Sequence, residues 1–185
     1  MNLTKVVVQN GNVDLALKKF KAKVRQELEL KKDKYDDIDD EIMKIAIASD
    51  HGGYELKENI KKYLESRDIE IVDLGTYSEE SVDYPAFGKA CGDAVASGKA
   101  DRGIVCCGTG IGISIAANKV KGIRCALCTD TYMAEMSRKH NASNILALGG
   151  RTTGVDKALR ITKAWLDTEF EGGRHQRRVN MLNEM

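Results

Sequence analysis

The sequence predicts an α/β fold, in which helices cover both faces of a parallel β-sheet. From residue 44 onward, five short apolar segments alternate with longer segments that have helical patterning. Short apolar strands separated by helices are typical of a parallel sheet that is buried on both faces. Residues 1–42 differ in their charge pattern, and we interpret them as an added N-terminal helical extension.

The composition is that of an ordinary globular protein. The chain has 185 residues, 42% hydrophobic and 31% charged, which suits one sizeable domain with an appendage. Its net charge of +1 argues neither for nor against a nucleic-acid partner. No apolar run approaches the roughly 18 residues of a membrane span, so we expect no membrane association and no signal peptide. Five cysteines without zinc-like spacing fit reduced thiols in a cytoplasmic protein.

The extension, residues 1–42, is predicted to contain a short strand, a turn and a basic amphipathic helix, followed by an acidic linker. Residues 1–26 hold six basic groups and one acidic group, whereas residues 27–42 hold three basic and eight acidic groups. The linker ends where Met43 introduces a new apolar strand. We therefore expect two parts, residues 1–42 and residues 43–185.

The second part is predicted to alternate strand and helix to its end. The predicted strands are residues 44–48, 69–75, 102–107, 123–128 and 144–150. The predicted helices are residues 53–67, 85–97, 111–119, 130–140 and 153–170. Pro85 suits a first helical turn, where its missing N–H has no partner to lose. A basic segment, residues 172–185, ends the chain.

Polar residues follow two of the predicted strands, at the sheet edge where ligands bind in such folds. The first strand ends in Asp50 and His51, and an acid beside an imidazole suits proton transfer near neutral pH. The alternative is that Asp50 only caps the next helix. The third strand ends in Cys107, followed by glycine at every second position. This spacing is neither the dinucleotide fingerprint nor the P-loop.

The glycine loop, residues 108–114, is interpreted as an anion site. Its amides converge at a helix N-terminus, where they favour a bound phosphate or a negative charge that develops during reaction. The same dipoles favour a thiolate at Cys107. Cys106 precedes it and should point to the opposite face of the sheet, into core packing. Cys91, Cys125 and Cys128 are interpreted as small core residues.

Further basic and polar residues complete the candidate set. His140 and Asn141 follow a helix, where a lone histidine is more often a capping group. Arg151 follows the fifth strand, and the tail carries Arg174 and Arg178. Arginine matches phosphate oxygens, although a solvated basic helix is the alternative for the tail. The inventory fits a small phosphorylated substrate that undergoes proton transfer without a cofactor or metal.

Residues 43–185 resemble the type B ribose-5-phosphate isomerases, a family that includes the galactose-6-phosphate isomerase subunits. The matching motifs are "SDHGG", "DLGTYSEESVDYP", "CGTGIGISIAANKVKGIRCAL", "RKHNASNILALGGR" and "EGGRHQRRV". The resemblance implies a Rossmann-like three-layer fold with a five-stranded parallel sheet, working as a homodimer or tetramer. It also implies interconversion of ribose 5-phosphate and ribulose 5-phosphate through an enediolate, with no metal or cofactor.

The resemblance also implies roles for individual residues. Cys107 would move the proton between carbons 2 and 1, Thr109 would help to position it, His140 would assist ring opening, and Asp50 would lie near the ring oxygen. The tail arginines would reach the partner subunit's site. The implied substrate-binding set, for the phosphate, the enediolate and the sugar hydroxyls, is His51, Tyr84, Gly108, Gly110, Ile111, Gly112, Ile113, Ser114, Asn141, Arg151, Arg174 and Arg178.

Two other functions remain open at this point. The first is isomerisation of a six-carbon sugar phosphate, such as galactose 6-phosphate or allose 6-phosphate. The second is a non-catalytic sugar-phosphate-binding module whose N-terminus contacts RNA. The stretch "KVVVQNGNVDLALKKFKAKV" resembles the start of the smallest bacterial small-subunit ribosomal protein, which would make residues 1–42 the one place for nucleic-acid contact. The interpretation that we favour for this stretch is a fused segment, such as a helical appendage.

Overall fold

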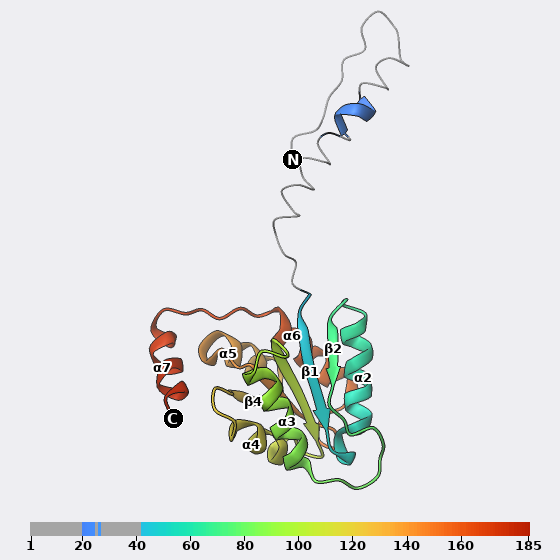
Figure 1. The fold of residues 1–185 in the computed structure, drawn as a ribbon, viewed down its shortest axis with the longest axis vertical. Coiled ribbons are helices and arrows are strands. Elements are labelled where there is room, and N and C mark those ends of the chain that lie inside the picture. The colour runs from blue at the N-terminus through green and yellow to red at the C-terminus, as the bar shows by residue number, and fades with distance from the viewer. Residues whose placement is uncertain (1–19, 25, 27–41) are drawn as a thin grey trace, which may run out of the picture. The chain divides into compact units, whose positions relative to one another are not determined.

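The computed structural model describes residues 20–24, 26 and 42–185 (Figure 1). The chain divides into two units, Met1–Glu41 and Ile42–Met185. In the first unit, residues 20–24 and 26 are helical, within the predicted basic helix. The predicted strand, turn and acidic linker lie outside the described residues, and the role of the extension stays a prediction.

The second unit is built on a five-stranded sheet in the order β2-β1-β3-β5-β4. Figure 1 shows β1 and β2 side by side. All neighbouring strands pair in parallel, which confirms the predicted α/β fold. The strands are β1 (Lys44–Ser49), β2 (Glu70–Asp73), β3 (Arg102–Cys107), β4 (Cys125–Leu127) and β5 (Ile145–Gly149). The central strands β1, β3 and β5 are almost wholly buried, whereas the edge strands β2 and β4 are shorter and partly exposed.

Helices cover both faces of this sheet. They are α2 (Tyr54–Glu65), α3 (Tyr84–Ala96), α4 (Ile111–Asn118), α5 (Thr131–Asn141), α6 (Val155–Asp167) and α7 (Arg174–Asn183), and a short turn η1 (His51–Gly53) precedes α2. Pro85 lies in the first turn of α3, as predicted. Among the described residues, no helix has the length and apolar character needed to cross a bilayer.

The alternation of side chains along β1 separates two apolar cores. Ile45 and Ile47 pack with residues of α2, α5 and α6 on one face. Ala46 and Ala48 pack with residues of α3 and α4 on the other face. On α2, Leu56, Ile60 and Leu64 form a buried apolar stripe, and burying one leucine or isoleucine contributes roughly 1.5–3 kcal/mol to folding. The result is the three-layer arrangement that the sequence predicts.

The strand order predicts a ligand site at the carboxyl ends of β1 and β3. The chain leaves β1 for β2 on one side and returns through α3 to β3 on the other side. At such a switch point the connections diverge and leave space at the carboxyl ends of the two strands. The residues that follow β1 and β3 therefore border the expected ligand site.

Candidate active site

Asp50 follows β1 and is held at the edge of the sheet. Its side chain is almost fully buried, and Oδ1 accepts a hydrogen bond of 3.1 Å from the Gly53 amide. The Asp50 amide donates to the Cys106 carbonyl at 3.2 Å, which ties the end of β1 to β3. Asp50 thus caps the turn η1, as the alternative interpretation expected. A carboxylate has a second oxygen, so capping leaves an acceptor for another partner.

His51 is oriented by the chain that follows β2. The amide of Val82 donates to His51 Nδ1 at 3.2 Å. A neutral imidazole that accepts at Nδ1 carries its proton on Nε2. His51 is half-buried and lines a cavity of about 470 Å³. It therefore offers an N–H donor from the wall of this cavity.

The cavity lies beside two helix N-termini and an arginine. Gly53 is the N-cap of α2, and Gly154, in the cavity wall, is the N-cap of α6. Arg151 also lines the cavity; its amide donates to the Gly108 carbonyl at 2.8 Å. Helix N-termini and guanidinium groups both favour anions. The lining residues are His51, Gly52, Glu55, Leu56, Glu79, Gly150, Arg151, Thr153, Gly154 and Val155.

The glycines allow the backbones near Arg151 to approach closely. A side chain at Gly108 would lie 3.4 Å from Arg151 Cδ, and one at Gly52 would lie 3.1 Å from the Gly108 nitrogen. The "SDHGG" turn and the glycine loop are therefore in contact at the carboxyl ends of β1 and β3. The structure thus brings Asp50, His51 and the glycine loop together.

Cys106 and Cys107 point to opposite faces of the sheet, as the sequence predicts. Cys106 is wholly buried in the core formed with α2 and α6. Burial raises the pKa of its thiol well above the usual range, and the neighbouring Cys107 adds to this effect. Cys107 lies on the face of α3 and α4, where the Gly110 amide donates to its Sγ at 3.1 Å. This contact places an N–H donor at the sulfur of Cys107.

Gly110 shapes the loop that holds Cys107. It is the N-cap of α4 and has a φ of 78°, in the region that favours glycine. A side chain there would lie 2.6 Å from Leu127 Cδ1 and 2.8 Å from the carbonyl carbon of Leu148. Both the backbone angle and the close approach of β5 therefore require glycine.

Several amides of the loop already have partners inside it. The Ile111 amide donates to Thr109 Oγ1 at 3.2 Å, and the Ser114 amide donates to the Gly110 carbonyl at 3.2 Å. The Ser114 hydroxyl donates to the Ile111 carbonyl at 2.7 Å. Helix geometry gives the first-turn amides, here those of Gly112 and Ile113, no intrahelical acceptor. These two amides are the best donors for an anion in this segment.

Tyr84 lies over the start of α4. A side chain at Gly112 would lie 2.7 Å from the Tyr84 ring, so the ring packs on the backbone of this glycine. The Tyr84 side chain is 41% exposed and comes from the first residue of α3. It therefore borders the same edge as Cys107.

The remaining candidate residues lie at the opposite edge of the sheet. His140 and Asn141 end α5, just before β5 begins at Ile145. The other end of β5, Gly149, pairs with Cys107. A five-residue strand spans about 13 Å, so within one chain these residues are not brought to Cys107.

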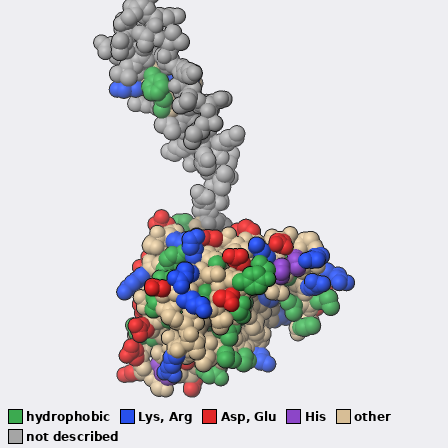
Figure 2. All heavy atoms as spheres, turned by 180° about the vertical axis from the view of Figure 1, so that it is seen from behind, with side chains coloured by type: hydrophobic (Ala, Val, Ile, Leu, Met, Phe, Trp, Pro, Cys, Tyr) green, Lys and Arg blue, Asp and Glu red, His purple; other side chains and the backbone are tan. Residues whose placement is uncertain are grey.

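His140 belongs instead to a basic cluster formed with α7. Its ring stacks on His175, with centroids 4.3 Å apart and planes 16° from parallel. Burial lowers the pKa of His175, as do the nearby His140, Arg174 and Arg178. Glu171 Oε2 lies 3.5 Å from His175 Nε2 and counteracts this effect. Figure 2 shows histidine side chains beside those of Lys or Arg at this edge of the molecule.

One group of described residues could hold a metal ion. His140, Glu171 and His175 each offer a ligand atom, and these atoms lie within 4.8 Å of one another. The two rings, however, are stacked nearly in parallel, so their nitrogen lone pairs do not converge on one point. The arrangement is that of a basic cluster more than that of a preformed metal centre.

The sequence analysis did not predict several residues in and around the candidate site. Glu55 and Glu79 line the cavity, and the Val82 amide orients His51. Val82 acts through its backbone, which has no sequence signature. His175 lies in the basic segment predicted at residues 172–185, and its contacts with His140 and Glu171 were not predicted. Glu171 precedes the start of α7 at Arg174, so no helical spacing signalled this contact.

Known proteins resemble residues 43–185 closely. The family described as Ribose/Galactose Isomerase matches residues 45–182. Ribose-5-phosphate isomerase B of Escherichia coli is 49% identical, over 75% of this chain and 93% of that protein. D-erythrulose-4-phosphate isomerase of Pectobacterium atrosepticum is 44% identical, over 71% of this chain and 88% of that protein.

A solved structure agrees with the fold. Ribose-5-phosphate isomerase B of Clostridium thermocellum superposes with a TM-score of 0.76 and 60% identity, covering 77% of this chain and 96% of that one. These matches lend no support to the ribosomal-protein resemblance of the N-terminal segment, because the family match begins at Ile45. They indicate an enzyme, not a non-catalytic binding module. The chain belongs to the ribose/galactose isomerase family, and it is an aldose–ketose isomerase.

Proposed function

We propose that this protein interconverts ribose 5-phosphate and ribulose 5-phosphate, with Cys107 as the base. The observation that supports this proposal is the hydrogen bond that Cys107 Sγ, at the carboxyl end of β3, accepts from the Gly110 amide at the N-terminus of α4. The thiolate takes the proton from carbon 2, and the electron pair of that C–H bond forms the double bond between carbons 1 and 2, which leaves the negative charge on oxygen 1. The thiol then returns the proton to carbon 1, and the hydroxyl proton moves from oxygen 2 to oxygen 1, so no electrons leave the substrate.

The enediolate needs fixed dipoles, because the proton on carbon 2 is only weakly acidic. The first-turn amides of Gly112 and Ile113 at the N-terminus of α4 supply them. The Thr109 hydroxyl, which accepts from the Ile111 amide, restrains this turn. Asp50, held beside β3, accepts or donates a proton at the ring oxygen when the furanose opens.

The substrate's phosphate binds in the cavity beside the two helix N-termini. His51 donates from Nε2, Arg151 provides a guanidinium group, and the starts of α2 and α6 provide oriented amides. Glu55 and Glu79 in the same wall are acceptors for sugar hydroxyls. Tyr84 closes the site on the side of α4.

A second copy of the chain completes this site. His140, Asn141, Arg174 and Arg178 lie at the opposite edge of their own sheet, so they serve the proposed reaction only from another subunit. Exposed apolar side chains suit such an association. They lie on α4, at the start of α5 and on α7: Ile111, Ile115, Tyr132, Met133, Met181 and Leu182.

A second substrate class comes from the relatives. The Pectobacterium protein is named for a four-carbon sugar phosphate, and the family description includes galactose. We therefore propose kcat/KM measurements on ribose 5-phosphate, D-erythrulose 4-phosphate, galactose 6-phosphate and allose 6-phosphate. The highest value is expected with ribose 5-phosphate. A clear preference for a four- or six-carbon sugar phosphate would contradict the proposed substrate, but it would leave the proposed type of reaction unchanged.

A further inference from the structure

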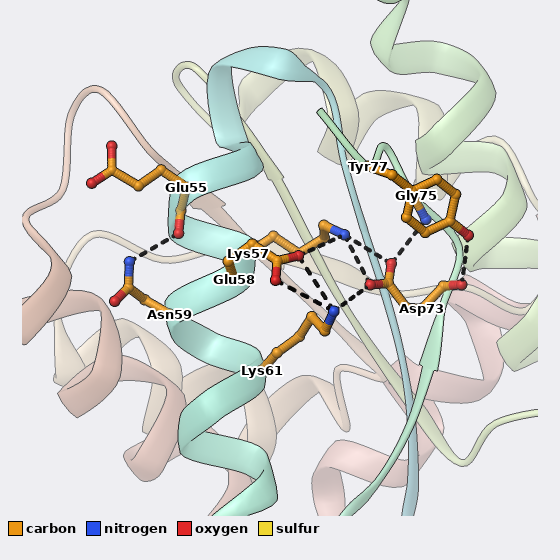
Figure 3. A network of polar contacts seen from close by, with 8 residues as sticks. All are labelled: Glu55, Lys57, Glu58, Asn59, Lys61, Asp73, Gly75 and Tyr77. Atoms are coloured by element: carbon orange, nitrogen blue, oxygen red, sulfur yellow. Dashed lines mark hydrogen bonds and ion pairs between the residues drawn. The ribbon is translucent and has the colours of Figure 1, made fainter. Parts of the chain in front are cut away.

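Lys57 is a fully buried lysine on α2, outside the candidate active site. Its side chain is 0% exposed, and its Nζ lies 2.8 and 3.0 Å from the two carboxylate oxygens of Asp73, at the end of β2 (Figure 3). Lysine is among the residues least often buried. Replacing a buried ion pair by apolar side chains is often neutral or stabilising. Stability alone therefore does not account for this pair.

The Asp73 carboxylate joins α2 to the chain that follows β2. Besides Lys57, Lys61 Nζ lies 2.7 Å from Oδ2, and the Gly75 amide donates to Oδ1 at 2.9 Å. The Tyr77 hydroxyl donates to the Asp73 carbonyl at 3.0 Å, and its ring lies 5.3 Å from Lys57 Nζ. Figure 3 shows these groups converging on Asp73. The first residues after β2 are thus fixed to α2.

Residues 74–83 continue from this junction to the candidate active site. The Ser49 amide donates to the Gly75 carbonyl at 2.7 Å, which holds the segment against the end of β1. At its far end, the Val82 amide donates to His51 Nδ1 at 3.2 Å. The segment that Asp73 anchors is therefore the one that orients His51.

We propose that Lys57 is a positioning residue for phosphate binding, which acts through Asp73 and residues 74–83 on His51. This inference rests on the proposed function, in which His51 donates to the substrate's phosphate. Loss of Lys57 removes the bidentate partner of Asp73 and the cation beside the Tyr77 ring. The segment can then shift, and His51 loses its fixed orientation. Cys107 lies on the opposite face of the sheet from α2, in the core formed with α3 and α4.

Lys57→Met tests the proposal, because it removes the charge and keeps an apolar chain of similar length. The KM for ribose 5-phosphate should rise about tenfold while kcat stays within about threefold, the pattern of lost ground-state binding. Lys62→Met is the matched control: Lys62 is exposed on the same helix and lies outside the network in Figure 3. Its KM should match that of the unaltered protein.

Two measurements separate this idea from a merely structural role. Hydrogen exchange should accelerate in residues 74–83 of Lys57→Met and stay unchanged in α4. Calorimetric titration with inorganic phosphate should show weaker binding, and this readout needs no turnover. If Lys57→Met does not fold, Tyr77→Phe replaces it, since the Tyr77 side chain is 70% exposed and loses only its hydroxyl. Hydrogen exchange in residues 74–83 of Tyr77→Phe should also accelerate.

Several results would overturn the proposal. One is an unchanged KM together with unchanged exchange in residues 74–83. Another is a fall in kcat with no change in KM or phosphate affinity, which would indicate an effect on the chemical step. A wild-type protein that binds phosphate but does not isomerise ribose 5-phosphate would instead refute the proposed function. The phosphate titrations would still decide the role of Lys57 in that case.

Discussion

Two adjacent cysteines end β3, and their surroundings assign them different chemistry. Cys106 is wholly buried among apolar side chains, and burial raises its pKa well above the usual range. Cys107 accepts a hydrogen bond from the Gly110 amide at the start of α4. Both thiols are buried, but Cys107 has this amide donor at its sulfur, so we propose Cys107 as the base in the proton transfer.

The paired variants Cys107→Ala and Cys106→Ala test this assignment. We expect Cys107→Ala to lower kcat at least about a hundredfold, since a positioned base contributes about 10²–10⁴. Cys106→Ala, the same change one residue earlier, should leave kcat within about threefold. Both are measured with ribose 5-phosphate under saturation. A Cys107→Ala enzyme within threefold of the original, or a hundredfold loss with Cys106→Ala, would reverse the assignment.

Among the elements, α4 begins after an N-cap position, Gly110, that requires glycine. Gly110→Ala should lower the free energy of unfolding by about 2 kcal/mol or more, because it adds strain at positive φ to a clash with Leu127 and β5. Gly98→Ala is a matched control: Gly98 has the same φ of 78° but nothing within 4 Å of the added carbon. It should cost about 1 kcal/mol, for backbone strain alone. Urea unfolding measures the free energy of unfolding of both variants. Equal losses would show that backbone strain alone, without the clash, accounts for the requirement for glycine at position 110.

Asp73 links the stability of α2 and β2 to pH. Partial burial alone would raise its pKa, but hydrogen bonds from Lys57 and Lys61 outweigh burial and hold the pKa below the usual 3.8. A group whose folded pKa is depressed stabilises the fold above its unfolded pKa, and this contribution is lost as pH falls through the folded pKa. The free energy of unfolding should therefore fall below about pH 4. Asp73→Asn should make that decrease smaller, as measured by urea unfolding between pH 5 and pH 2. An equal decrease in the free energy of unfolding of both proteins would contradict this.

The elements were largely predictable from sequence because each has a local signal. The apolar runs of β1 and β3 and the stripe on α2 predicted them, and Pro85 predicted the first turn of α3. The edge strands were predicted too long: β2 spans Glu70–Asp73 and β4 spans Cys125–Leu127. Edge strands pair on one side only, so apolar residues at their ends belong to loops. The Val82–His51 contact had no signal, because a backbone amide bonds across a long sequence separation.

At the scale of the whole molecule, the sequence could bring together only the residues at the carboxyl ends of neighbouring strands. Asp50 follows β1 and Cys107 ends β3, and these two strands pair side by side. His140 ends a helix that returns to the opposite edge, so the same rule does not reach it. His140 and Cys107 both belong to the motifs of the family resemblance, yet they lie at opposite edges of the sheet within one chain.

The N-terminal extension should be dispensable for isomerisation. The family match begins at Ile45, and Ile42–Met185 forms a unit of its own. A protein that starts at Met43 should keep kcat/KM for ribose 5-phosphate within about threefold of the full chain, because no proposed site residue is removed. Size-exclusion chromatography of both proteins checks that association is unchanged. A truncated protein that folds and associates but shows no turnover would make the extension part of the enzyme.

Mixing two inactive variants tests whether the active site is shared between subunits. Cys107→Ala removes the proposed base, and His140→Asn removes the proposed ring-opening group at the other edge of the sheet. If each site takes Cys107 from one copy and His140 from another, a mixed dimer contains one intact site and one doubly altered site. Unfolding and refolding the two variants together in equal amounts should then restore about a quarter of wild-type activity, since half of the dimers are mixed and each has one of two sites. Each variant refolded alone is the control. A mixture no more active than those controls would mean that both residues act within one chain, against the separation of about 13 Å along β5.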